Sequence, residues 1–179
     1  MKGFIKWALF IFIINAIFAI VGYFTMDENS MAGEGGLGQI LYYLGMLVAL
    51  AFLFLGIREK KMSDPSEFTF GKGFTEGLLI SVLAGLFIGI FSYVFYTYVA
   101  PEVIDFIRAR SFAAMEEQGT SADQIEQARP MMEFFISPMG FFITMLIMYT
   151  IGGLILSLIM SAIVNAMGPK SGGNEPVTA

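Results

Sequence analysis

The fold is decided by residues 73–100, GFTEGLLISVLAGLFIGIFSYVFYTYVA. Glu76 is the only charged side chain in this stretch, and Pro101 follows it directly. About 20 consecutive apolar residues are enough for a helix to cross the hydrocarbon core of a bilayer. The stretch therefore predicts a transmembrane helix that ends before Pro101, because proline does not continue a helix.

Three further apolar runs resemble this one. Lys6 is the only charge in the first run, and the block Arg58-Glu59-Lys60-Lys61 stops the second. Together the runs predict an all-α integral membrane protein with four transmembrane helices, built as a single domain over residues 1–167. The polar end, residues 168–179, is expected to be disordered. The four predicted spans are residues 4–26, 38–57, 73–100 and 138–164.

Composition agrees with a membrane chain and excludes several kinds of site. Of the 179 residues, 56% are hydrophobic and 14% are charged, with a mean hydropathy of +0.74, whereas a soluble domain carries about 25% charged residues. The chain has no cysteine and no histidine. Disulfides, thiolate metal sites, histidine-based catalytic triads and histidine zinc sites are therefore excluded. No cofactor or metal is expected.

A cleaved signal peptide is the alternative for the first run. Lys2 and Lys6 form a basic start, and Ser30-Met31-Ala32 loosely fits a cleavage site. The apolar region of a signal peptide covers only about 7–15 residues, and this run is longer. We therefore expect it to remain as a transmembrane helix.

Residues 101–137 form the only sizeable segment between spans. Pro101 suits the first turn of a helix, which Gly119 should stop. Ser121 and Gln124 have the spacing of a capping box for a second helix, which Pro130 should end or kink. These signals predict a helical hairpin leaning on the membrane, with a solvated loop as the alternative. Its apolar residues that need cover are Val103, Ile104, Phe106, Ile107 and Phe112.

Basic residues set the orientation. With four spans, every lysine and Arg58 fall on one side, and the other side holds only Arg108, Arg110 and Arg129. Short loops rich in lysine and arginine mark the cytoplasmic face. Both termini are therefore expected in the cytoplasm and the hairpin outside it, which places the chain in a bacterial inner membrane. The lysines are Lys2, Lys6, Lys60, Lys61, Lys72 and Lys170.

Small residues recur every fourth position in two spans. Residues four apart share a helix face, and small residues on such a face let helix backbones approach closely in lipid. Close packing of spans three and four against a neighbour is therefore expected, within one chain or against an oligomer or partner. The series are Gly73, Gly77, Ser81, Gly85 and Gly89 in span three and Gly153, Ser157 and Ser161 in span four.

Two polar groups at membrane depth are candidate site residues. An ionisable residue within a span, such as Glu76, is costly and is a functional candidate. The structural alternative pairs it with Lys72 one turn away, or places it in the first turn, where the helix dipole favours negative charge. Asn15, near the middle of span one, is expected to form a hydrogen bond to another helix. A substrate-contacting role for Asn15 is the alternative.

The order of motifs is similar to that of a known family. The elements are LGIREKK at 55–61, FTFGKGFTEG at 68–77 and MEEQGTSADQIEQARPMMEFFISP at 115–138, followed by an apolar span. They resemble the bacterial membrane-protein family catalogued as domain of unknown function 4199, over nearly the whole chain. The resemblance implies a four-span inner-membrane protein without an established activity, so no catalytic residues can be assigned from it.

Three classes of function remain open. We expect a non-enzymatic accessory or scaffold subunit that binds another membrane protein through the small-residue face or the acidic hairpin. The alternative is a small oligomeric carrier or channel, for example of a lipid-linked substrate. An enzyme is not expected, since Glu116 and Glu117 lack metal-ligand spacing. The expected partners are membrane lipids and a membrane protein or further copies of the chain, and no nucleic acid.

Overall fold

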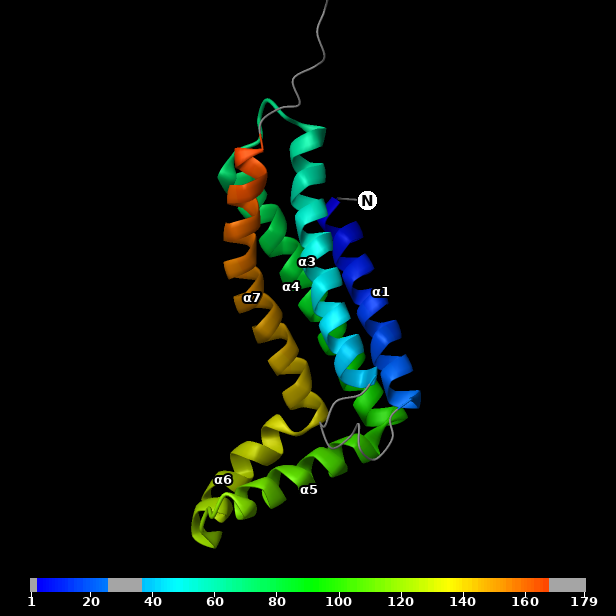
Figure 1. Ribbon diagram of the computed structural model, residues 1–179, viewed down its shortest axis with the longest axis vertical. Coiled ribbons are helices and arrows are strands. Elements are labelled where there is room, and N and C mark those ends of the chain that lie inside the picture. The colour runs from blue at the N-terminus through cyan, green and yellow to red at the C-terminus, as the bar shows by residue number, and fades with distance from the viewer. Residues whose placement is uncertain (1–2, 26–36, 168–179) are drawn as a thin grey trace, which may run out of the picture.

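The computed structural model describes residues 3–25 and 37–167 (Figure 1). All regular secondary structure in these ranges is helical. The expected disordered tail, residues 168–179, and the weighed cleavage site Ser30-Met31-Ala32 lie outside the described residues. The described residues contain seven elements: α1 (Gly3–Phe24), α3 (Leu37–Ser63), α4 (Phe70–Val94), the π-helical turn η1 (Phe95–Val99), α5 (Pro101–Glu117), α6 (Ala122–Phe135) and α7 (Pro138–Ala166).

Within residues 3–25 and 37–167, four helices are long and apolar enough to cross a membrane. They are α1, α3, α4 continued by η1, and α7. Three of them are longer than the predicted spans, because α3 continues through its charged block to Ser63, α7 ends at Ala166 and α4 begins at Phe70. Thr69 sets that start, since its side chain accepts a hydrogen bond from the backbone N–H of Lys72 and caps the helix. The chain is thus a multi-pass membrane protein with an all-helical fold.

Helix α4 is the centre of the bundle. In its most apolar window 44% of the residues are buried, against 11% in α1 and α7. It lies between α7 and the pair formed by α1 and α3 (Figure 1). The core is therefore built around its side chains: Ile80, Ala84 and Ile88 of α4 with Ala8, Ile11, Leu53, Ile57 and Val164.

The small residues of α4 and α7 interlock with each other. Gly77 faces Ser157, and a Cβ added to it would lie 2.6 Å from the serine Oγ. One turn further along α4 the roles reverse, because Gly153 of α7 faces Ser81. At the start of α4, Gly73 faces Ser161, whose hydroxyl also donates to the Phe70 carbonyl at 2.6 Å. Gly85 and Gly89 continue the series against Tyr149 and Phe142.

This interlocking uses up the small-residue face within one chain. Ser81 is buried, and Ser157 and Ser161 are fully buried between the two helices. Of the two accounts of the face, packing within the chain is the one that the structure supports. The face is therefore not free for a partner, which removes the small-residue argument for an accessory role.

The segment between α4 and α7 is a helical hairpin at one end of the bundle (Figure 1). Gly119 ends the turn after α5 with a φ of +76°, in the region that favours glycine. Ser121 and Gln124 form the predicted capping box at the start of α6. Pro130 lies inside α6, which continues to Phe135, so it does not end the helix.

A break in the helix, surrounded by apolar side chains, joins the hairpin to the bundle. Ala100 interrupts the helix between η1 and α5, and Phe95, Ala100 and Val103 form a small buried cluster there. The Tyr23 hydroxyl at the end of α1 donates a hydrogen bond to Glu102. This bond holds the pKa of Glu102 below its usual value. The start of α5 is thereby fastened to α1 and α4.

Candidate functional site

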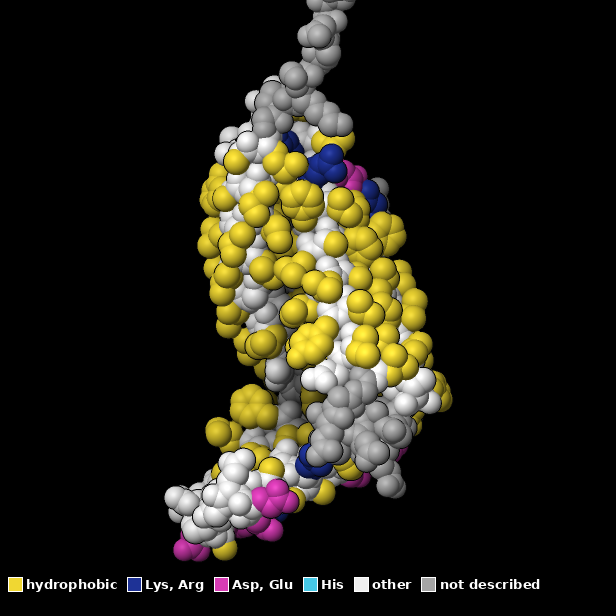
Figure 2. Space-filling model, viewed as in Figure 1, with side chains coloured by type: hydrophobic (Ala, Val, Ile, Leu, Met, Phe, Trp, Pro, Cys, Tyr) yellow, Lys and Arg dark blue, Asp and Glu magenta, His cyan; other side chains and the backbone are white. Residues whose placement is uncertain are grey.

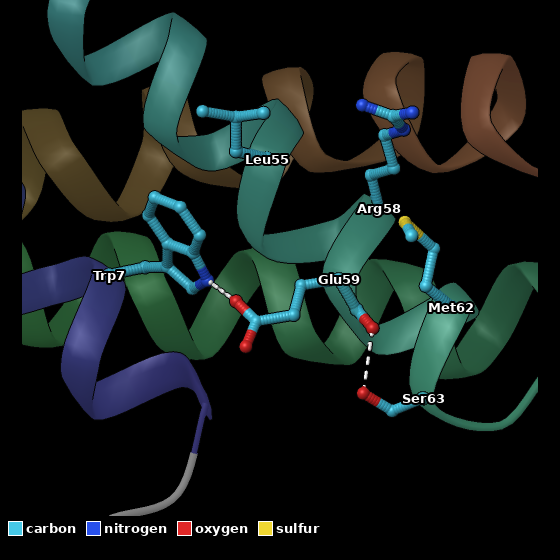
Figure 3. A pocket seen from close by; sticks show the side chains of 6 residues that line it. All are labelled: Trp7, Leu55, Arg58, Glu59, Met62 and Ser63. Atoms are coloured by element: carbon cyan, nitrogen blue, oxygen red, sulfur yellow. Dashed lines mark hydrogen bonds between the residues drawn. The ribbon is translucent and has the colours of Figure 1, made fainter.

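Charged side chains gather at the end of the bundle opposite the hairpin (Figure 2). The start of α1 and the end of α3 meet there. The Lys6 ammonium lies 2.6 Å from both carboxylate oxygens of Glu59, and the Trp7 indole N–H donates to the same carboxylate at 2.5 Å. Figure 3 shows Trp7 and Glu59 turned toward each other. A shallow pocket of about 270 Å³ lies beside them. Its lining is Trp7, Leu55, Arg58, Glu59, Met62 and Ser63.

Lys61 joins the end of α3 to the end of α7. Its ammonium donates to the backbone carbonyls of Val164 at 2.8 Å and Asn165 at 3.2 Å, and to that of Met167. The last carbonyls of a helix have no partner within the helix and carry the negative end of its dipole. A lysine from the neighbouring helix therefore satisfies them here.

Glu76 is the buried acid of this end. Its residue is only 9% exposed, in the second turn of α4. Oε1 would lie 3.2 Å from a Cβ on Gly3, and the backbone N–H of Phe4 points to the carboxylate. The charge of Lys60 attracts the Glu76 carboxylate. No ion pair of Glu76 within 4.0 Å is present among the described residues. The acid thus faces the first turn of α1, where unpaired N–H groups favour negative charge.

Both structural explanations predicted for Glu76 are wrong in detail. The ammonium of Lys72 pairs with Glu67 at 2.8 Å and not with Glu76, because Glu67 lies in the loop just before the helix cap. The hydrogen bond from the Lys72 ammonium holds the pKa of Glu67 below its usual value. Since α4 begins at Phe70, Glu76 also lies beyond the first turn of its own helix. The dipole that it faces is that of α1.

A groove of about 620 Å³ opens beside Glu76. It combines two ammonium groups, three carboxylates and two hydroxyls, so it presents both signs of charge. Within the described residues, no three metal-ligating side chains are placed to hold a metal ion. The arrangement is suited to a proton, or to a polar group that carries both charges. The lining residues are Lys60, Asp64, Glu67, Phe68, Thr69, Gly71, Lys72, Thr75 and Glu76.

Asn15 is not part of this groove, and its predicted hydrogen bond to another helix is wrong. Its amide N–H donates to the Ile11 carbonyl at 2.9 Å, within α1. The amide oxygen lies against Gly45 of α3, where there is no room for a Cβ. Asn15 therefore satisfies its donor locally and packs against a neighbouring glycine.

The sequence did not predict the roles of Glu59 and Lys61. Glu59 binds Lys6 and Trp7 from a position 53 residues away, and Lys61 reaches α7 from 103 residues away. The charged block after span two was recognised only as a stop signal. One signal was available in the sequence. In a four-span topology, this charged block lies at the same membrane face as the start of span one and the end of span four.

The comparison with protein families extends over nearly the whole chain. A family model described as "Protein of unknown function (DUF4199)" matches residues 6–166. The chain belongs to this family. The match confirms the resemblance to the DUF4199 family that the sequence motifs indicated. No curated protein and no solved structure matches this DUF4199 chain.

Proposed function

We propose that this DUF4199 protein is a non-enzymatic accessory or scaffold subunit of a bacterial inner-membrane complex. The observation that carries the proposal is the α5–α6 hairpin, which projects beyond the bundle and exposes an acidic surface. Because α7 covers the small-residue face of α4, the hairpin is the part of the chain best suited to reach a partner. Its acidic residues are Glu102, Asp105, Glu116, Glu117, Asp123, Glu126 and Glu133.

The positive charges of the hairpin are largely paired internally. Arg108 binds Asp105 at 2.8 Å, and Arg129 binds Glu126 at 2.9 Å. Each pair lies within one helix, so neither ties the hairpin to the bundle. The tip around Glu116 and Glu117 remains negative and exposed. Such a surface favours a partner with basic residues, since complementary charge steers association and fixes register.

The proposed orientation of the protein in the membrane follows from its basic residues. Lys6, Lys60, Lys61, Lys72 and Arg58 lie at the end of the bundle away from the hairpin. This end is proposed to face the cytoplasm, together with both termini. The hairpin then lies on the extracytoplasmic side, where it would meet the partner.

Charge reversal at the tip tests the proposal. Glu116→Lys with Glu117→Lys places basic residues in the last turn of α5, where the helix dipole tolerates them. The protein is extracted from its native membrane in lipid nanodiscs, and the mass and composition of the particles are measured. We expect a stoichiometric second protein with the wild type and its loss with the double variant.

The control makes the same change of charge at the other end of the bundle. Asp64→Lys with Glu67→Lys alters two acids outside the spans, one half-buried and one exposed, and should retain the partner. Absence of any stoichiometric protein from wild-type particles would contradict the accessory role. Retention of the partner by the tip variant would contradict its binding site.

A small oligomeric carrier or channel is the second candidate. The buried Glu76 carboxylate beside the groove favours it, because an ionisable group there can take up a proton or attract a cation. Particles that contain several copies of the chain with bound lipid and no partner would support this candidate. Loss of the cellular phenotype in Glu76→Gln, with unchanged protein level, would then link the groove to transport.

A further inference from the structure

Helix α6 has two unlike faces. Met131, Phe134 and Phe135 lie three and four residues apart, so they share one face. They are 64%, 48% and 49% exposed, although all three are large and apolar. Since a helix turns about 100° per residue, Glu133 lies about 200° around from Phe135. The same sequence therefore presents an apolar stripe and, opposite to it, an acidic one.

Arg129 of the charged stripe holds α6 against α5, while the acids beside it stay exposed. Arg129 pairs with Glu126 at 2.9 Å and approaches Glu133 at 3.9 Å. Its guanidinium also lies 4.8 Å from the centre of the Phe112 ring of α5. Because these contacts hold one side of α6 against α5, the apolar stripe is turned away from the hairpin's own partner helix.

The junction with α7 places this stripe beside the first turn of a membrane span. Ser137 caps α7, accepting a hydrogen bond from the Gly140 N–H at 3.0 Å. A Cβ on Gly140 would lie 2.6 Å from the Phe135 carbonyl oxygen and still closer to that of Phe134. The last turn of α6 is therefore pressed against the first turn of α7. Any side chain larger than hydrogen at residue 140 would push the two apart.

Exposed apolar side chains continue on the other side of this junction. Met139 at the start of α7 is 48% exposed. Figure 2 shows hydrophobic side chains where the hairpin approaches the spans and acidic ones toward its outer end. A helix of 14 residues is too short to cross the bilayer. Its apolar side chains thus lie at the level where a membrane surface begins.

We propose that α6 is an interfacial helix that inserts Met131, Phe134 and Phe135 into the outer leaflet of the membrane. Phenylalanine and methionine on one face and charges on the other are typical of helices that lie in the interface. The stripe contains no basic residue, so contact with lipid depends on apolar burial and not on anionic headgroups. The hairpin then lies along the membrane with its acidic face toward water.

This inference does not depend on the proposed partner. It concerns the face of α6 opposite the acids that were assigned to partner binding. In turn, it gives those acids a fixed orientation, because a helix held in the interface cannot rotate about its axis. A failure of partner co-purification would leave the lipid contact intact, and a failure of the lipid contact would leave the tip acids available.

The test uses the absence of cysteine from the chain. Met131→Cys, Glu133→Cys and Phe135→Cys each introduce a single thiol that can be labelled with a nitroxide without any background substitution. The full chain is reconstituted in phosphatidylcholine nanodiscs. Collision rates of each label with oxygen, which concentrates in lipid, and with a water-soluble nickel chelate are measured by electron paramagnetic resonance.

The three positions form a matched set along two turns of one helix. We expect a ratio of oxygen to nickel collisions several-fold higher at residues 131 and 135 than at residue 133, which is the control. Equal nickel access at all three positions would overturn the proposal, because the hairpin would then project into water. Protection of 131 and 135 from both reagents would also overturn it, since protein would then cover the stripe. Met131 is the most exposed of the three apolar side chains, so its variant reports even if Phe135→Cys fails to fold.

Discussion

Alanine substitutions at two adjacent glycines of α7 should have opposite effects on stability. A Cβ on Gly153 would lie 2.5 Å from the Ser81 Oγ and even closer to the Ser81 Cβ. A Cβ on Gly152 would meet nothing within 4 Å. The two residues share one helix, one membrane depth and the same chemical change. The difference between them therefore isolates the close approach of α4 and α7.

The size of the effect follows from packing. An ordinary Cβ contact is 3.4–4 Å, so Gly153→Ala forces the helices apart by about 1 Å, and a gap of that size forfeits a quarter to a half of each dispersion contact. Overpacking of this kind costs about 1–3 kcal/mol. At Gly152 only the helix propensity changes, which favours alanine by about 0.5–1 kcal/mol. We expect the two variants to differ by about 1.5–4 kcal/mol in the free energy of unfolding.

A second substitution supplies the rescue. Ser81→Gly removes the Cβ and Oγ that the new methyl group meets, so Gly153→Ala with Ser81→Gly should recover most of the loss. Unfolding is followed by circular dichroism as the denaturing detergent fraction is raised in mixed micelles, with membrane insertion checked by extraction. Equal stability of the Gly152 and Gly153 variants, or no recovery in the double variant, would refute the interlocking of α4 with α7.

Three further outcomes are expected. Lys61→Met should lower the free energy of unfolding by about 1–2 kcal/mol, since hydrogen bonds from a charged group to the α7 carbonyls are lost. Hydrogen exchange at the end of α7 should become faster in this variant and stay unchanged in the control, Lys60→Met. Glu76→Gln should cost at most about 1 kcal/mol, because the attractions of the carboxylate to the first turn of α1 and to Lys60 are lost; a larger loss on detergent unfolding would show that Glu76 makes a stronger contact than these two. In Tyr23→Phe the pKa of Glu102 should rise toward its usual value, because the hydrogen bond from the tyrosine hydroxyl is lost, and carboxylate NMR follows this change. Because this pKa is lowered in the fold, the contact stabilises the protein above the unfolded pKa and is lost as the pH falls through the folded one. The protection factor against hydrogen exchange at the start of α5 should therefore fall in acid in the wild type but not in Tyr23→Phe.

The sequence predicted those features that depend on composition and on spacing within one element. Apolar length identified the four membrane helices, and the i,i+4 recurrence of small residues marked the faces on which α4 and α7 meet. The capping box at Ser121 was readable for the same reason, because both of its partners lie within one turn. Local geometry was sufficient in each case.

Predictions failed where two acceptors competed for one donor. The i,i+4 spacing predicted an ion pair between Lys72 and Glu76, but Lys72 pairs with Glu67 in the preceding loop. Membrane depth suggested a bond from Asn15 to another helix, but the carbonyl one turn back is nearer. The contacts of Glu59 and Lys61 join helix ends that are far apart in sequence. They depend on the angles and offsets between helices, which spacing within one helix does not contain.

The connection between α4 and α7 is itself an argument for a role of the hairpin. The two helices pack against each other along their small-residue faces, so their ends are close on both sides of the bundle. Helix–helix connections in bundles need only about 2–8 residues. The chain instead places two capped helices, α5 and α6, between the spans, with one end fastened through Tyr23 and Glu102 and the other pressed against Gly140. Packing of the spans does not require this structure. Its two fixed ends, its acidic face and its apolar stripe are the features that the proposed interfacial hairpin requires.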